Sequence, residues 1–171
     1  MILIKYIILF IIFGISTSIG MLLSRKSVNR VIELKELKKS LNMIENKMKF
    51  TYEPLGEIFQ DVSKNTEGNI SDIYKNASEI LKRENTKEAW NQAIKLNEDK
   101  LNIDNEDKNI ILNLGKMLGV TDLEGQVSEL ELTSNFIDVQ IVKAEDERKK
   151  NEKLYRSLGS IIGLAIVIIL I

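Results

Sequence analysis

The sequence predicts an all-α protein: a helical bundle of about six helices between an N-terminal and a C-terminal transmembrane helix. Three observations predict this architecture. The chain of 171 residues begins and ends in apolar segments, and the apolar residues of its charged middle recur at helical spacing. One proline and nine glycines leave little room for a turn-rich β fold. We divide the chain into an N-terminal transmembrane helix (1–23), a cytosolic helical domain (24–156) and a C-terminal transmembrane helix (157–171).

The first apolar segment is ILIKYIILFIIFGISTSIGMLL, residues 2–23, which contains one charge, Lys5. It is long enough to cross a hydrocarbon core of about 30 Å. Lys5 lies close enough to the terminus to reach the far interface. The alternative is a cleaved signal peptide. However, the apolar run exceeds the usual length of such a peptide, and its basic flank, with Arg25 and Lys26, follows the run.

The last apolar segment carries no charge from Leu158 to Ile171. Extended back to Tyr155, it covers about 25 Å as a helix, and it is apolar on every face, which suits a tail anchor better than a core helix. Tyr155 and Arg156 stand where an interfacial aromatic ring and a snorkelling cation are expected. Basic residues flank the inner ends of both segments. The positive-inside rule therefore predicts a cytosolic middle domain, with both termini on the opposite side of the membrane.

The first four helices of the middle domain are predicted from their apolar faces. Pro54 ends the first helix and is expected at the first position of the second. Thr86 is predicted to cap the fourth, in which Trp90 belongs to the core. The four buried faces are Leu34, Leu37, Leu41, Ile44 and Met48; Leu55, Ile58, Phe59 and Val62; Ile70, Ile73, Tyr74, Ala77, Ile80 and Leu81; and Ala89, Trp90, Ala93 and Ile94.

The last two helices are predicted from their end signals. Asp104 begins the fifth helix, and Gly119 follows its end. Thr121 and Glu124 form a predicted capping box, with Thr121 at the N-cap. No helix breaker occurs after Gly125, so the last helix should run unbroken into the terminal segment, and the first should do the same in reverse. The apolar face of the last helix is Leu123, Val127, Leu130, Ile137, Ile141 and Ala144.

The composition excludes several kinds of chemistry. Cysteine and histidine are both absent, so the chain has no disulfide, no thiol nucleophile and no imidazole base or ligand. The formal net charge of −1 offers no overall basic footprint for nucleic acid. The acidic stretch around Asp104 fails as a calcium loop, because Asn109 stands at the sixth position, where glycine is required. We predict no catalytic residue, no cofactor and no metal site.

A GxxxG pair, Gly159 and Gly163, lies in the last apolar segment and predicts a close helix contact. Its partner could be the first span, where Gly14 and Ser18 are small. A second copy of the chain and another protein are the alternatives, and the sequence leaves all three open.

Several short motifs in this order resemble the stage III sporulation protein AB family over essentially the whole chain. The most telling is the closing YRSLG before an apolar tail. Members usually carry threonine before the Pro-Leu pair, where this chain has Glu53. The motifs are Glu53-Pro54-Leu55, Glu88-Ala89-Trp90, Leu118-Gly119, Asp122, Gln126 and Tyr155-Arg156-Ser157-Leu158-Gly159.

The resemblance implies a non-enzymatic scaffold in the mother-cell membrane around the forespore of an endospore-forming bacterium. There it would join a channel assembly needed for endospore development. The helical domain is similar to the cytoplasmic domains of the F-type platform proteins of type II secretion and type IV pilus systems. By that analogy it would dock a secretion-type ATPase and form a homodimer. The alternative function is a secreted or extracellular helical or coiled-coil protein, anchored at its C-terminus after signal-peptide cleavage.

Overall fold

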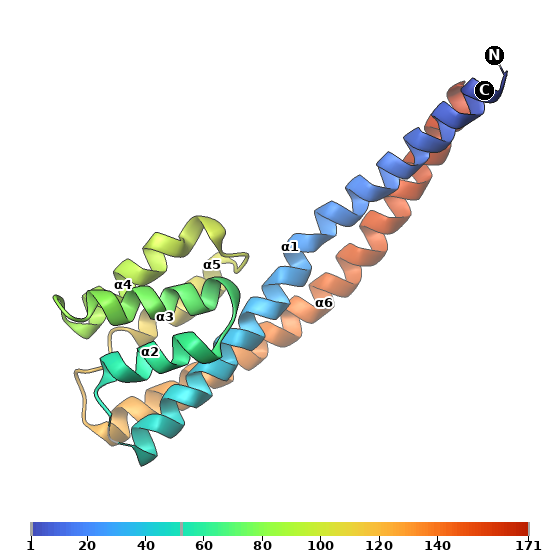
Figure 1. The fold of residues 1–171 in the computed structure, drawn as a ribbon. Coiled ribbons are helices and arrows are strands. Elements are labelled where there is room, and N and C mark those ends of the chain that lie inside the picture. Colours follow the sequence, from blue (N-terminus) through green and yellow to red (C-terminus); the bar gives the residue numbers. More distant parts are fainter. Residues whose placement is uncertain (1, 52, 171) are drawn as a thin grey trace. The chain divides into compact units, whose positions relative to one another are not determined.

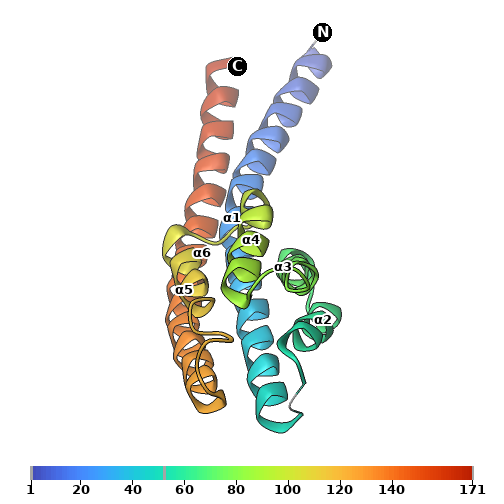
Figure 2. The ribbon, with the colours of Figure 1, turned by 90° about the vertical axis from the view of Figure 1, so that its left-hand side faces the viewer.

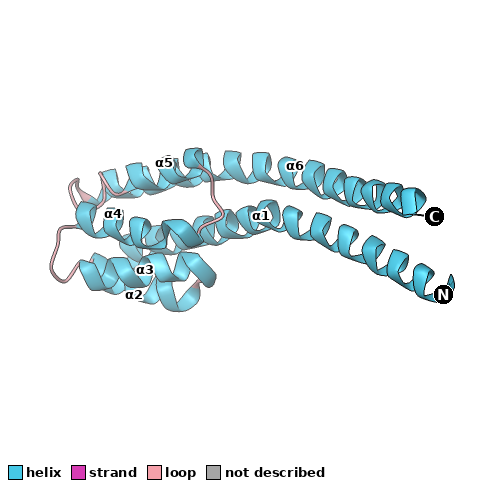
Figure 3. Cartoon of the chain, turned by 90° about the horizontal axis from the view of Figure 1, so that it is seen from above, coloured by secondary structure: helices cyan, strands magenta, loops and turns pink. Residues whose placement is uncertain are grey.

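The computed structural model describes the backbone of residues 2–51 and 53–170, together with most side chains between residues 25 and 155 and scattered ones nearer the two ends. The regular structure of this range is helical, and it contains no strand (Figure 3). As predicted, α1 and α6 each continue unbroken into an apolar terminal segment. The elements are α1 (Ile2–Phe50), α2 (Leu55–Asn65), α3 (Gly68–Ile80), α4 (Thr86–Asn97), η1 (Glu98–Lys100), α5 (Asn105–Leu114) and α6 (Leu123–Leu170).

The contacts divide the chain into two compact units, which we describe separately. Unit 1 comprises residues 1–29 and 144–171, and unit 2 comprises residues 30–143. Across the described residues, no helix combines the length and the apolarity that a membrane crossing requires. Most side chains of the two predicted spans, 1–23 and 157–171, lie outside the described set. The two spans therefore stay predictions.

In unit 2, α2 packs on α3 and α3 packs on α4, and this group lies beside α1, while α5 lies along α6 (Figures 1 and 2). The predicted apolar faces are confirmed for most positions, including the whole stripe on α1. Four positions differ: Leu55, Leu81 and Ile141 are half-buried, and Leu123 is exposed. Leu123 is exposed because it is the first residue of α6 and lies beside an open pocket.

An aromatic cluster forms the centre of the core. Phe59, Tyr74 and Trp90 are fully buried, with ring centroids 5.3 to 5.6 Å apart. The Trp90 indole donates to the Ile111 carbonyl oxygen (2.6 Å), and the Tyr74 hydroxyl is hydrogen-bonded to that of Ser40 (2.8 Å). Burial raises the pKa of Tyr74, so the phenol keeps its proton. Both polar groups of the cluster are therefore satisfied without water.

A buried ion pair fastens α5 to α1. The Arg30 guanidinium donates from Nε and Nη2 to both carboxylate oxygens of Asp107, at 2.8 and 3.1 Å. Asp107 is fully buried, and its carboxylate also accepts from the backbone N–H of Asp104. Asp104 caps α5 and lies 2.6 Å from Arg30. The predicted start of α5 is confirmed, and its capping box provides the partner for a buried cation.

Three predicted helix ends are wrong. The side chain that caps α4 is Asn85, which accepts from Glu88, so Thr86 becomes the first helical residue. Pro54 precedes the first residue of α2 and keeps an extended backbone, because no side chain caps this helix. The regular helix α5 stops at Leu114, followed by turns as far as Gly119.

The last turn of α5 lies against Trp90, whose indole donates to the Ile111 carbonyl oxygen and whose ring leaves no room for a Cβ atom at Gly115. From Gly115 the chain continues in turns rather than in a regular helix. Gly119 is nevertheless left-handed, with a φ of 77°, as predicted for the residue after a helix.

Surface ion pairs should give unit 2 a broad pH plateau. Hydrogen bonds from Lys47 and Lys49 lower the pKa values of Asp61 and Glu131 below their ordinary 3.8 and 4.5. The stability that these ion pairs contribute is fully present above the ordinary pKa values of the unfolded state. It is lost as the pH falls through the lower pKa values of the folded state. Hydrogen bonds, chiefly with Glu53, raise the pKa of Lys47 above 10.5, so its contribution is lost only as the pH rises beyond that value.

We therefore expect the urea midpoint of a fragment spanning residues 24–153 to stay constant between about pH 5 and pH 10. The chain has no histidine to titrate near neutrality. Asp61→Asn with Glu131→Gln should flatten the acidic limb and should weaken the alkaline one only in part, because Glu53 and Glu45 remain as the main partners of Lys47 and Lys49. A sloping midpoint between about pH 6 and pH 8 would contradict this assignment.

Candidate partner-docking site

An open pocket of about 340 Å³ lies at the end of unit 2 where α1 ends and α6 begins. Its lining is largely apolar, and Glu53 is its one charged residue. The lining residues are Met48, Glu53, Leu55, Ile58, Thr86, Gly119, Leu123 and Gln126. Four of them belong to the motifs that carry the resemblance: Glu53, Leu55, Gly119 and Gln126. Residues up to 78 positions apart in the chain, Met48 to Gln126, thus come together in one surface.

The loop between α5 and α6 is pinned to the first turn of α6. The Gly119 amide donates to the side-chain oxygen of Gln126 (2.8 Å), and the Gln126 amide group donates back to the Thr121 carbonyl oxygen (2.7 Å). A Cβ atom added to Gly119 would lie 2.5 Å from the Thr86 hydroxyl oxygen. This wall of the pocket therefore needs glycine both for its backbone angle and for its close approach to α4.

Gly119→Ala should lower the free energy of unfolding by about 2 kcal/mol, because it adds left-handed strain to a clash with Thr86. The matched control is Gly68→Ala, since Gly68 also has a positive φ (61°) but has open space around its Cβ position. The free energy of unfolding of this control should fall by only about 1 kcal/mol. Urea denaturation measures both variants, and equal losses would show that the contact with Thr86 contributes nothing.

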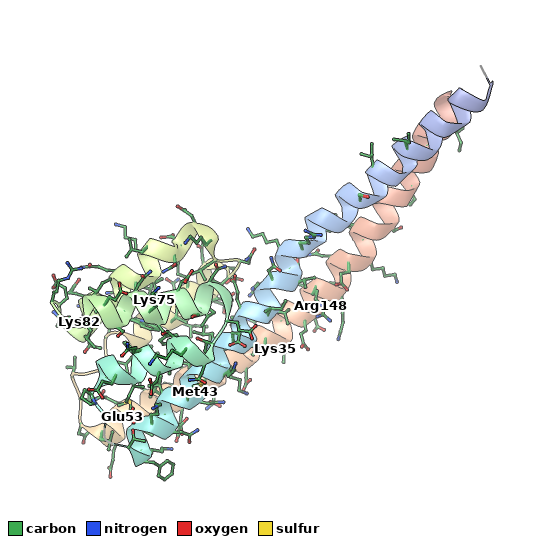
Figure 4. All side chains as sticks on the ribbon, viewed as in Figure 1. Lys35, Met43, Glu53, Lys75, Lys82 and Arg148 are labelled. Carbon is green, nitrogen blue, oxygen red and sulfur yellow. The ribbon has the colours of Figure 1, made fainter. Side chains whose placement is uncertain are left out.

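Glu53 is held at the pocket by a cation. Lys47 donates to Glu53 and to Asp61, at 2.9 Å each, and so joins the end of α1 to α2 (Figure 4 labels Glu53). The N-cap residue of α2 is Pro54, and no side chain caps this helix. The ion pair with Lys47 fixes the Glu53 carboxylate, one residue earlier, at the rim.

Large apolar side chains close in sequence to the lining residues are exposed. Phe50, the last residue of α1, is 77% exposed, and Val120, in the loop before α6, is 72% exposed. Leu123 adds a third exposed apolar group, inside the pocket. Such a surface can bury an apolar segment of a partner, while Glu53 and Gln126 offer polar contacts at its edge.

The predicted capping box of α6 is wrong. The helix begins at Leu123, and the Asp122 carboxylate accepts from the Gly125 amide (3.0 Å), so the capping residue is Asp122. The Thr121 hydroxyl is buried and has no hydrogen-bond partner among the described residues. Glu124 is exposed in the first helical turn. Asp122 takes the role because Gln126 engages the Thr121 carbonyl and fixes that residue in the loop.

The other predicted residues fall in three groups. Trp90 is in the core, as predicted, whereas Pro54 directly precedes α2 and the half-buried Leu55 is the first residue of that helix. In unit 1, Arg25 and Lys26 are exposed and Tyr155 is half-buried. Gly14 and Ser18 are exposed on α1, where the Ser18 hydroxyl donates to the Gly14 carbonyl oxygen (2.8 Å). The surroundings of Arg156, Gly159 and Gly163 lie outside the described side chains.

Sequence reasoning missed a second candidate surface in unit 2, a groove of about 360 Å³ between α5 and α6 whose lining mixes apolar side chains with polar and charged ones. Ile110 lines it from α5, and Phe136 and Val139 line it from α6. With Leu132, the two α6 residues form an exposed stripe at helical spacing, apart from the buried face of that helix. This helical spacing is the sequence signal that could have revealed the exposed stripe. It was overlooked because α6 carries a second apolar stripe, which is buried.

Comparison with known proteins agrees with the resemblance. The sequence model of the family described as stage III sporulation protein AB matches residues 5–171. Stage III sporulation protein AB of Bacillus subtilis (strain 168) is 24% identical over 157 residues, which cover 91% of this chain and 92% of that protein. A solved structure of stage III sporulation protein AB has a TM-score of 0.68 at 21% identity, over 71% of this chain and 98% of that one. Because the family match spans nearly the whole length, the chain belongs to the stage III sporulation protein AB family, and its role lies in sporulation.

Proposed function

We propose that this protein is a non-enzymatic integral membrane scaffold of the mother-cell–forespore channel assembly, which docks a secretion-type ATPase at the membrane. One observation carries the proposal: residues from three separate motifs, Glu53 with Leu55, Gly119, and Gln126, line one open pocket, although other motif residues lie in the core. A docking site explains that clustering, because it needs several side chains on one surface, whereas fold maintenance does not.

The membrane part of the proposal is supported by unit 1. Several described side chains there are large, apolar and exposed, among them Ile11, Ile15 and Ile161. The Ser18 hydroxyl is satisfied within its own helix by the Gly14 carbonyl, which allows a serine to sit in hydrocarbon. The basic flanks favour a cytosolic unit 2. The docking pocket then lies where α1 ends and α6 begins, whereas the proposed spans occupy the other ends of these two helices.

The ATPase is proposed to contact the pocket and its exposed rim. Phe50, Val120 and Leu123 supply apolar area, and the Glu53 carboxylate favours a partner segment with an apolar side chain next to a lysine or arginine. Binding by the purified segment 24–153 to the ATPase of the same assembly tests this. Phe50→Asp and Val120→Asp should each weaken binding at least ten-fold, because each buries a charge in the interface.

The control for this experiment is Leu96→Asp, which alters an exposed leucine on α4 away from the pocket. It should leave binding unchanged. Equal effects of all three variants, or no binding by the unaltered segment, would refute docking at this pocket.

The topology has its own test against the secreted alternative. The chain contains no cysteine, so one introduced at the exposed Glu67 is a unique label. In intact cells, Glu67→Cys should resist a membrane-impermeant maleimide and should react after the cells are opened. Labelling in intact cells would place unit 2 outside the cytosol and favour the secreted protein.

We further propose a homodimer, since the F-type platforms that this domain resembles normally carry it twice. The α5–α6 groove, where the exposed Phe136 and Val139 lie among polar and charged side chains, supplies a surface for a second copy. Sedimentation of the segment 24–153 should show a dimer that Phe136→Asp converts to a monomer. A strict monomer at high micromolar concentration would contradict it.

A further inference from the structure

Unit 1 brings basic residues from two helices to the same level. Here α1 and α6 run antiparallel, and the Asn151 side-chain amide donates to the Ser27 hydroxyl oxygen at 2.8 Å. This hydrogen bond sets the register of the pair. Two residues before Ser27 on α1 is Arg25, and two residues after Asn151 on α6 is Lys153, so these cations lie at one level along the antiparallel helices.

We name this group of exposed cations the basic collar: Arg25, Lys26, Lys149, Lys150 and Lys153. Within the described part of the chain, Lys149 has one distant carboxylate neighbour, Asp146 at 3.8 Å, and the other four form no ion pair. The α6 acid next to the collar, Glu152, faces Arg148 at 4.0 Å. The collar therefore carries positive charge that the protein itself leaves largely uncompensated.

An apolar stripe continues from the collar on the same face of α6. Leu154, Leu158 and Ile161 are all exposed, and they follow Lys150 at intervals of four, four and three residues. Residues at these intervals lie one above another on a helix. On α1, Ile11 and Ile15 are also exposed, fourteen and ten residues before Arg25. On α6, a cation thus stands at the head of a stripe of apolar side chains.

This juxtaposition matches one class of ligand. An anionic phospholipid has a phosphate that lysine and arginine bind, and acyl chains that lie along apolar side chains. Free inorganic phosphate would use the cations but not the stripe. We propose that the basic collar and the apolar stripe below it form a binding site for anionic phospholipids, selecting them over zwitterionic ones. The inference rests on the proposed membrane insertion and adds to it a preference among lipids.

Lipid binding by the full-length chain in detergent micelles tests the proposal. Fluorescent phosphatidylglycerol should bind at least ten-fold more tightly than the same probe on phosphatidylcholine, because each cation near an anionic headgroup contributes about five-fold. The triple variant Lys149→Gln, Lys150→Gln, Lys153→Gln should lose this preference. The unaltered chain should lose the same preference at high salt, because salt screens the charges. Millimolar inorganic phosphate should not displace the lipid.

The matched control removes the same charge from unit 2: Lys75→Gln, Lys82→Gln, Lys95→Gln, all exposed (Figure 4 labels Lys75 and Lys82). Its lipid preference should equal that of the unaltered chain. Equal affinity of the unaltered chain for both lipids, or equal losses in the two triple variants, would overturn the lipid site. Resistance of the chain in phosphatidylcholine vesicles to alkaline carbonate reports membrane insertion separately. A chain that resists extraction but shows no lipid preference refutes the site alone, whereas an extracted chain refutes the proposed anchoring.

Discussion

Gly115→Ala is expected to lower the free energy of unfolding of unit 2 by about 3 kcal/mol, close to the upper end for an overpacked core. The added Cβ atom would approach Trp90 to 2.3 Å at Cδ1 and 3.0 Å at Cγ. Those atoms are part of a ring that is fixed by contacts with Phe59 and Tyr74 and by its hydrogen bond to Ile111. The ring cannot move aside without losing that bond, so the cost should be large.

The backbone at Gly115 does not require glycine, since its φ of −61° suits any residue. The predicted loss therefore comes from space alone. Gly56→Ala is the matched control: Gly56 lies within α2, and a Cβ there would have an ordinary contact of 3.6 Å with Leu81. This control should be neutral or up to about 1 kcal/mol stabilising, because alanine favours a helix over glycine. Similar urea midpoints for the two variants would show that the Trp90 ring tolerates displacement.

Arg30→Met is expected to lower the free energy of unfolding of unit 2 by about 3–5 kcal/mol, since it leaves the Asp107 carboxylate buried without its cation. Asp107 is 0% exposed, and its remaining hydrogen-bond donor is the Asp104 amide. The exposed counterpart is the pair Lys38–Asp138, at 2.5 Å, which also connects two helices. Lys38→Met should cost no more than about 1 kcal/mol, because water screens that pair.

A double-mutant cycle separates the ion pair from the packing of the arginine stem. Asp107→Leu should lower the free energy of unfolding much less in the Arg30→Met background than in the unaltered chain. In that background the Asp107 carboxylate has already lost its cation, and the substitution removes the unpaired charge. Urea denaturation of all four proteins gives the coupling energy. Additive losses would mean that Arg30 and Asp107 stabilise unit 2 independently.

The helices could be predicted from sequence because each has an apolar stripe at its own period, as on α1, where Leu34, Leu37 and Leu41 are all buried. Helix ends were less predictable, since several side chains compete for them. Asn85 and Thr86 are adjacent potential caps, as are Thr121 and Asp122, and only tertiary contacts decide between them. The last turn of α5 lies against Trp90, which donates to the Ile111 carbonyl oxygen from 21 positions away in the chain. No local pattern contains such information.

The candidate site was accessible from sequence only in part. The motifs of the resemblance named Glu53, Gly119 and Gln126, but nothing local indicated that the three share a pocket. Their meeting depends on how α2 and the loop before α6 pack at the same end of unit 2. The buried partner of Arg30 was likewise hidden, because that arginine looked like one more cation of a membrane flank.

Trp90 makes the protein its own reporter of folding. It is the single tryptophan, and it is fully buried among aromatic neighbours in unit 2. Its emission should be blue-shifted in the native state and should move to longer wavelength only when unit 2 opens. The surfaces proposed for ATPase docking and for lipid binding do not include its ring. Tryptophan fluorescence can therefore distinguish a variant that no longer binds its partner from a variant that no longer folds.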